Sequence, residues 1–156
     1  TNTPELDNRH DYTDSKHAHA DALLAMLGMT ERRDSLWPFM SQGERGRTLI
    51  ARALMPQPPL LLLDEPATGL DLAAREKLLA GIDQLRAEVP TLATVLVTHH
   101  LEDLPASTSH ALLLRDGKIV AAGTVDEALT SKTISTCFDH PVDVRRTAGR
   151  WSAVAV

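Results

Sequence analysis

The sequence predicts an α/β fold of mainly parallel, buried strands flanked by helices, with a β-hairpin toward the C-terminus. Residues 60–63 are four consecutive leucines. An apolar run that does not alternate with polar residues is typical of a strand buried on both faces of a parallel sheet. Apolar residues recur at helical spacing on both sides of this run. Asp116-Gly117 lies between two apolar runs and predicts a hairpin over residues 111–122.

The first two predicted helices precede the leucine run. One spans residues 17–29, with Gly28 as its C-terminal cap. The other spans residues 44–55. Ser41 is its expected N-cap, and Glu44 three residues later completes a capping box. On its buried side we expect Leu49, Ile50, Ala53 and Leu54.

A third helix and a second strand follow the leucine run. The helix spans residues 72–88, begins after Asp71 as N-cap, and carries the apolar stripe Leu78, Leu79, Ile82 and Leu85. The strand at 92–97 is apolar and β-branched. Residues 131–156 form a C-terminal extension in which 142–146 and 150–154 predict a second hairpin.

Composition limits the function classes. The chain has 156 residues, 43% hydrophobic and 24% charged, which is ordinary for one globular domain. The net charge is −5 and no basic patch indicates nucleic-acid binding. No run approaches 18 apolar residues and no signal peptide is evident. The single Cys137 excludes an internal disulfide, and we expect it to be partly buried.

We assign no function to the polar N-terminal segment or to the aromatic residues before Ser41. Residues 1–16 are polar, and we expect them to be flexible. His10, His17 and His19 lack a framework of further metal ligands, so we expect solvated histidines. Trp37 and Phe39 form an apolar clip before Ser41, and we expect them to pack locally.

The chemistry-bearing residues lie at the expected carboxyl ends of the two strands. Asp64 continues the leucine strand and Glu65 turns away from it. Open α/β sheets bind ligands at this edge, where one carboxylate commonly holds Mg²⁺ and its neighbour orients or deprotonates a water. His99 follows the second strand, where an imidazole can bond a γ-phosphate or the attacking water. The helix N-terminus at Ser41 and Gly43 can receive phosphate.

In their order and spacing these residues resemble the ATP-binding cassette (ABC) ATPases over about residues 17–130. The matching segments are Ser41-Gln42-Gly43-Glu44 for the signature motif (commonly Leu-Ser-Gly-Gly-Gln), Leu60–Asp64 for Walker B, Glu65 for the catalytic glutamate, Gly69-Leu70-Asp71 for the D-loop and Thr98-His99 for the switch histidine. The chain departs from the common pattern at Met40, Gln42, Glu44 and Gly46.

The resemblance implies a P-loop NTPase-like layered fold, truncated at the N-terminus. It implies ATP and Mg²⁺ as cofactors, with Asp64 positioning the metal, Glu65 polarising water and His99 contacting the γ-phosphate. The residues implied to bind the nucleotide are Ser41, Gln42, Gly43, Glu44 and Asp71. Of these, Ser41 and Gly43 are implied to bind the nucleotide held by the opposite chain. The implied partners are a second ABC nucleotide-binding domain in a head-to-tail dimer and a transmembrane permease. The implied location is cytoplasmic, at the inner face of the membrane.

Two family elements are missing from this sequence. No glycine fits the phosphate-cradling pattern Gly-x-x-x-x-Gly-Lys-Ser/Thr (Walker A), and no glutamine before Ser41 can serve as a Q-loop. We therefore expect a truncated or split protein that is inactive alone, with an unpaired strand edge beside residues 92–97. The leading hypothesis is the energy-coupling subunit of a transporter. The alternatives are a non-catalytic fragment or interaction module that donates its signature to a partner's ATP site, and a soluble, non-transport ABC ATPase.

Overall fold

The computed structural model describes residues 13–156. Its α-helices are α1 Asp14–Met26, α2 Gln42–Leu54, α3 Leu72–Glu88, α4 Val125–Ala128 and α5 Ser131–Phe138. Its strands are β1 Leu60–Asp64, β2 Ala93–Val97, β3 His110–Arg115, β4 Lys118–Thr124, β5 Val142–Thr147 and β6 Arg150–Ala155. Short 3-10 turns occur at η1 Thr30–Arg32, η2 Trp37–Phe39 and η3 Leu101–Asp103.

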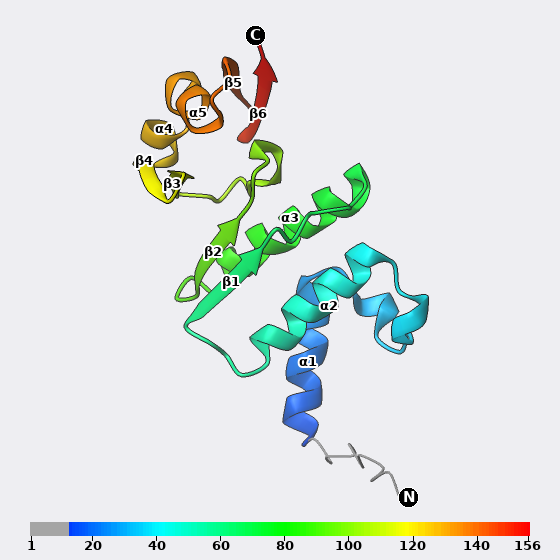
Figure 1. The fold of residues 1–156 in the computed structure, drawn as a ribbon. Helices are drawn as coiled ribbons and strands as arrows, with labels where there is room; N and C mark the ends of the chain where they lie inside the picture. The colour runs from blue at the N-terminus through cyan, green and yellow to red at the C-terminus, as the bar shows by residue number, and fades with distance from the viewer. Residues whose placement is uncertain (1–12) are drawn as a thin grey trace, which may run out of the picture.

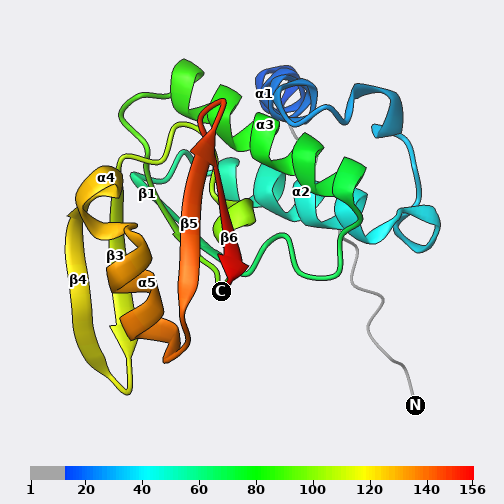
Figure 2. The same ribbon diagram turned by 90° about the horizontal axis from the view of Figure 1, so that it is seen from above.

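The elements form two groups. In the first, α1, α2 and α3 pack beside the β1–β2 sheet, and in the second, α4 and α5 pack with the β3–β4 and β5–β6 hairpins (Figures 1 and 2). The strands β1 and β2 are parallel, with Leu60 opposite Ala93 and Asp64 opposite Val97. Helix α3 connects them, so both strands end at the same edge of the sheet. This is the edge at which the sequence predicts a site.

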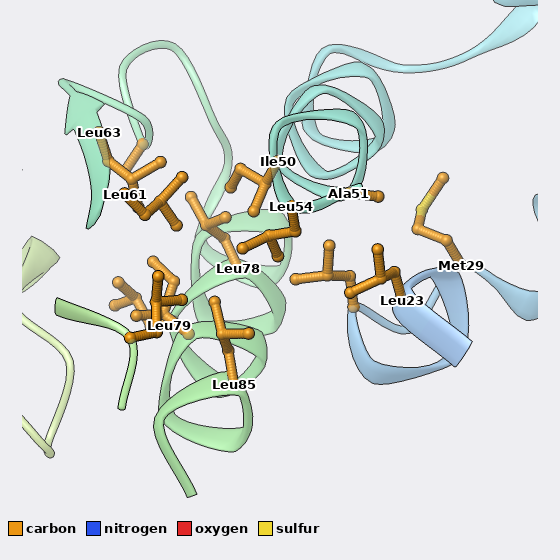
Figure 3. Close-up of a cluster of buried hydrophobic side chains, with 14 residues drawn as sticks. Leu23, Met29, Ile50, Ala51, Leu54, Leu61, Leu63, Leu78, Leu79 and Leu85 are labelled. Carbon is orange, nitrogen blue, oxygen red and sulfur yellow. The ribbon is translucent and has the colours of Figure 1, made fainter. Parts of the chain in front are cut away.

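The leucine run is buried on one face only, so the prediction of burial on both faces is wrong for this chain. Leu61 and Leu63 are 4% and 7% exposed, whereas Leu60 and Leu62 are 46% and 67% exposed. The reason is that the packed helices bury Leu61 and Leu63 against a single face of the sheet (Figure 3). Among the described residues β2 pairs only with β1, so its other edge is open, as the sequence indicates.

The main core lies between α1, α2, α3 and β1 (Figure 3). The α3 stripe is buried as predicted, at Leu78, Leu79, Ile82 and Leu85. On α2 the prediction is partly wrong. Ile50 and Leu54 are buried, but Leu49 and Ala53 are exposed and Ala51 takes their place. Both sets have helical spacing, and contact of α2 with α1 and α3 selects the stripe that includes Ala51.

The ends of α1 and α2 follow their local sequence signals. Gly28 has φ +65 and its N–H donates to Ala25 O at 3.0 Å, while the N–H of Met29 donates to Leu24 O at 2.7 Å. This is a Schellman cap, as Gly28 predicts. Helix α1 begins at Asp14, earlier than expected. The sequence predicts that residues 1–16 are flexible. Of these, residues 1–12 lie outside the described part of the chain.

The aromatic clip before α2 is largely exposed. The prediction of local packing is wrong for Phe39, whereas Trp37 packs locally against Arg45. Phe39 is 80% exposed, Leu36 65% and Trp37 45%. Arg45 donates from Nε to Trp37 O at 3.2 Å and lies over the Trp37 ring. Leu36, Trp37 and Phe39 are not among the described side chains that pack against the main core.

The second group has its own core around Val125, Leu129, Ile134 and Trp151. Both predicted hairpins are present. Helix α5 is not predicted by the sequence, because eight residues rich in Ser and Thr carry a weak helical signal. Cys137 is partly buried, as expected. No helix in the described residues is long and apolar enough to cross a membrane.

Candidate functional site

The candidate site lies at the carboxyl edge of the β1–β2 sheet. Glu65 leaves β1 with φ +44, and its N–H donates to Val97 O at 2.8 Å. Thr98 and His99 follow β2 directly. Because the two strands are parallel and end at the same register, their following residues meet at one point.

The Glu65 carboxylate joins the two strand ends. Its Oε1 lies 2.7 Å from His99 Nδ1, and its Oε2 accepts a hydrogen bond from Thr68 Oγ1 at 2.9 Å. The hydrogen bond from Thr68, and then the one with His99, lower the pKa of Glu65. Both side chains are partly exposed, at 40% for Glu65 and 56% for His99. The result is an ionised, accessible carboxylate that can accept a proton or a hydrogen bond from water.

Asp64 ends β1 beside this pair and is exposed. Within the described residues its carboxylate has no hydrogen-bond or ion-pair partner. Mg²⁺ prefers carboxylate oxygens and is commonly bound through one or two of them together with phosphate oxygens and water. The unpaired Asp64 carboxylate can therefore serve as one ligand of such an ion.

A buried carboxylate supports the turn that carries His99. Asp103, 5% exposed, accepts a hydrogen bond from Thr98 Oγ1 at 3.1 Å. The same hydroxyl accepts the N–H of His100 at 3.1 Å. Sequence reasoning missed Asp103, because nothing in the local pattern shows that a residue five positions on returns to Thr98.

The N-terminus of α2 carries the signature-like residues. Ser41 Oγ accepts the N–H of Glu44 at 3.3 Å, and the N–H of Ser41 donates to Glu44 Oε2 at 2.8 Å, which confirms the capping box. The hydrogen bond from the Ser41 backbone is the main cause of a lowered pKa of Glu44. Gly43 is buried, and an added Cβ would lie 3.0 Å from the Ala74 Cβ. Gly43 thus also permits close packing of α2 on α3.

The loop between β1 and α3 contacts the start of α2. Gln42 Nε2 donates to Thr68 O at 2.8 Å. Asp71 caps α3 by accepting the N–H of Ala74 at 2.7 Å, as predicted. The structure therefore brings Glu65 and His99 together, with Asp64 next to Glu65, and connects Gln42 to them through Thr68. Thr68 was missed, and its position three residues after Glu65 in a turn is the only local signal for it.

The chain matches the family model described as ABC transporter over residues 1–68. It is 44% identical over 134 residues to an uncharacterized ABC transporter ATP-binding protein, YlmA, of Bacillus subtilis, with 85% of this chain and 51% of that protein covered. A putative ABC transporter ATP-binding protein of Streptococcus mutans is 38% identical, with 86% and 52% covered. The thiamine import ATP-binding protein ThiQ of Vibrio parahaemolyticus is 39% identical, with 68% and 44% covered. The chain spans about half the length of the curated relatives it matches.

Solved structures share the fold. A putative metal-chelate type ABC transporter in an inward-facing conformation gives a TM-score of 0.78 at 25% identity, covering 96% of this chain and 61% of that one. An ATP-binding cassette in its ADP conformation gives 0.70 at 20% identity, covering 82% and 51%. The second likeness concerns the fold alone.

Proposed function

The chain belongs to the ABC transporter ATP-binding family, and we propose that it forms the C-terminal portion of a subunit that couples ATP hydrolysis to transport. The observation that carries the proposal is the pair of Glu65 and His99 at adjacent strand ends, 2.7 Å apart. An ionised carboxylate held against an imidazole can accept the proton of an attacking water, and the imidazole can contact the transferred phosphate.

In this proposal the residues have separate roles. Glu65 polarises the attacking water, and His99 contacts the γ-phosphate. Asp64 positions Mg²⁺, which, when bound, neutralises charge on the phosphates. Ser41 and Gly43, at a helix N-terminus, face the nucleotide of a second domain in a head-to-tail dimer.

The apolar face of the β1–β2 sheet supports the proposal that further chain completes the domain. Leu60 and Leu62 on β1 lie opposite Ala93 and Val95 on β2, and Leu62 and Val95 are 67% and 48% exposed. An exposed apolar sheet face with an open strand edge is a surface that natural proteins cover. We propose that the portion carrying the phosphate-binding loop covers it.

A second exposed patch fits a membrane partner. Trp37 and Phe39 in η2, and Leu36 directly before it, are 45% to 80% exposed. Exposed aromatic residues beside an arginine are typical of protein interfaces. We propose that this patch contacts a transmembrane permease, which places the subunit at the inner face of the membrane.

The test is Glu65→Gln in the complete subunit. Loss of the carboxylate removes the proton acceptor, so ATP turnover should fall by at least about 100-fold. Equilibrium binding of Mg-ATP should be retained, because the amide keeps the shape of the side chain. Glu88→Gln, at the exposed end of α3, is the matched control. It should leave ATP turnover and Mg-ATP binding unchanged. Normal turnover of Glu65→Gln would contradict the role of Glu65.

A second candidate function is donation of the signature to a partner that carries its own phosphate-binding loop. The exposed Ser41 at the start of α2 favours it, because the backbone N–H groups of a helix N-terminus can receive a phosphate. Added chain should then stimulate the partner's ATPase, and Ser41→Arg should abolish the stimulation. Absence of stimulation would contradict this second function.

A further inference from the structure

Three successive hydrogen bonds lead from the start of α2 to the end of β2. The first is from Gln42 Nε2 to Thr68 O, the second from Thr68 Oγ1 to Glu65 Oε2, and the third joins Glu65 Oε1 to His99 Nδ1. The distances are 2.8, 2.9 and 2.7 Å. Thr68 therefore uses its carbonyl for Gln42 and its hydroxyl for Glu65.

We propose that Gln42 is a positioning residue that holds the loop containing Thr68 and thereby orients the Glu65 carboxylate toward His99. The inference rests on the proposed function, because it assigns Gln42 a part in that reaction. Gln42 acts through Thr68 and touches neither Glu65 nor His99 by any hydrogen bond found in the described residues.

The loop between β1 and α3 leaves space at Gly69 that the Gln42 amide occupies. Gly69 has φ +73, a left-handed conformation that favours glycine. A Cβ at Gly69 would lie 2.8 Å from Gln42 Nε2 and 3.2 Å from Gln42 Oε1. The amide thus lies directly against the Gly69 backbone, in space that a side chain at position 69 would occupy.

The neighbouring helix contact fixes the distance that Gln42 must span. Gly43, the next residue, approaches Ala74 so closely that an added Cβ would lie 3.0 Å from the Ala74 Cβ. The start of α2 is therefore set against the start of α3 by the close packing of Gly43 on the Ala74 side chain. Gln42 extends from this fixed base to the loop before α3.

The connection depends on the side chain that this sequence places at position 42. The common form of the signature motif has glycine there, and glycine has no side chain with which to bond Thr68 O. Thr68 is held locally as well, because its N–H donates to Glu65 O at 3.1 Å. Gln42 adds a second hydrogen bond to Thr68, which the carbonyl of Thr68 accepts.

The first test compares variants in the complete subunit. Gln42→Met keeps the length of the side chain but removes the donor. We expect kcat for ATP hydrolysis to fall about fivefold, the effect of one net hydrogen bond, with KM for Mg-ATP little changed. Gln42→Glu should lower kcat further, because a carboxylate is held against a carbonyl oxygen. Gln42→Lys restores a donor and should recover most of the rate.

The second test measures the loop directly by hydrogen–deuterium exchange of the amides of residues 67–70. Exchange should be faster in Gln42→Met and unchanged in the control Gln84→Met, since the Gln84 side chain on α3 donates to Glu88 and is remote from this loop. Unchanged exchange in Gln42→Met, or unchanged kcat despite faster exchange, would overturn the proposal. The exchange result does not depend on hydrolysis, so it is separable from a failure of Glu65→Gln to stop turnover.

A double-mutant cycle tests the route through Thr68. Thr68→Val removes the hydroxyl that bonds Glu65 and leaves the Thr68 carbonyl in place. If Gln42 acts through that hydroxyl, Gln42→Met should reduce kcat little further in the Thr68→Val background. If the fold-reduction in kcat of the double variant equals the product of the two single reductions, Gln42 acts independently of the Thr68 hydroxyl. That result would overturn the proposed route.

Discussion

Leu61 and Leu62 are adjacent leucines in β1 with opposite environments, and their replacement by alanine should have very different costs. Leu61 is 4% exposed and Leu62 is 67% exposed. A buried Leu→Ala change costs about 2–5 kcal/mol, because transfer and cavity effects add. Full burial of a leucine side chain contributes about 1.5–3 kcal/mol, and Leu62 is only about one-third buried, so its loss should cost about 0.5–1 kcal/mol.

The assay is urea unfolding of the 156-residue chain, followed by circular dichroism at two protein concentrations. Leu61→Ala should lower the free energy of unfolding by at least about 2 kcal/mol, and Leu62→Ala by about 1 kcal/mol or less. Equal losses at low protein concentration would refute the one-sided burial of β1. In the complete subunit the cost of Leu62→Ala should rise to that of Leu61→Ala, because the proposed N-terminal portion covers this face.

Three further predictions concern a cap, a charge pair and the aromatic patch. Ser41→Ala should lower the free energy of unfolding by about 1 kcal/mol in thermal or urea unfolding, whereas Ser41→Asp should restore most of the loss. The hydrogen bond from Arg115 lowers the pKa of Asp139 below its ordinary value of 3.8. The stabilisation from this pair is therefore complete above the unfolded-state pKa and is lost as the pH falls through the folded-state pKa. Arg115→Gln should accordingly flatten the acid side of a plot of stability against pH, and an unchanged slope would contradict this. Phe39→Ser should leave the melting temperature within about 2 °C, because the ring is 80% exposed, but should weaken co-purification of the complete subunit with the proposed permease partner. Retained co-purification would argue against the patch as the contact.

Several features of the molecule follow from local sequence signals alone. The caps at Gly28, Ser41 and Asp71 depend on residues within one turn of the helix end, so their chemistry is complete in a short window. The stripe along α3 is decided by spacing in the same way. The prediction that Asp64, Glu65 and His99 meet at one edge depends on strand polarity, and two parallel strands joined by a helix fulfil it.

Other features depend on what packs against each element, and only the tertiary structure decided them. The sequence does not distinguish the environments of the four leucines. The helices cover only one face of the sheet and leave Leu62 exposed. Two helical stripes were available on α2, and its contacts with α1 and α3 selected the one with Ala51. The bond from Gln42 to Thr68 joins residues 26 positions apart. Such contacts require the final distance between two elements, and no local pattern contains that distance.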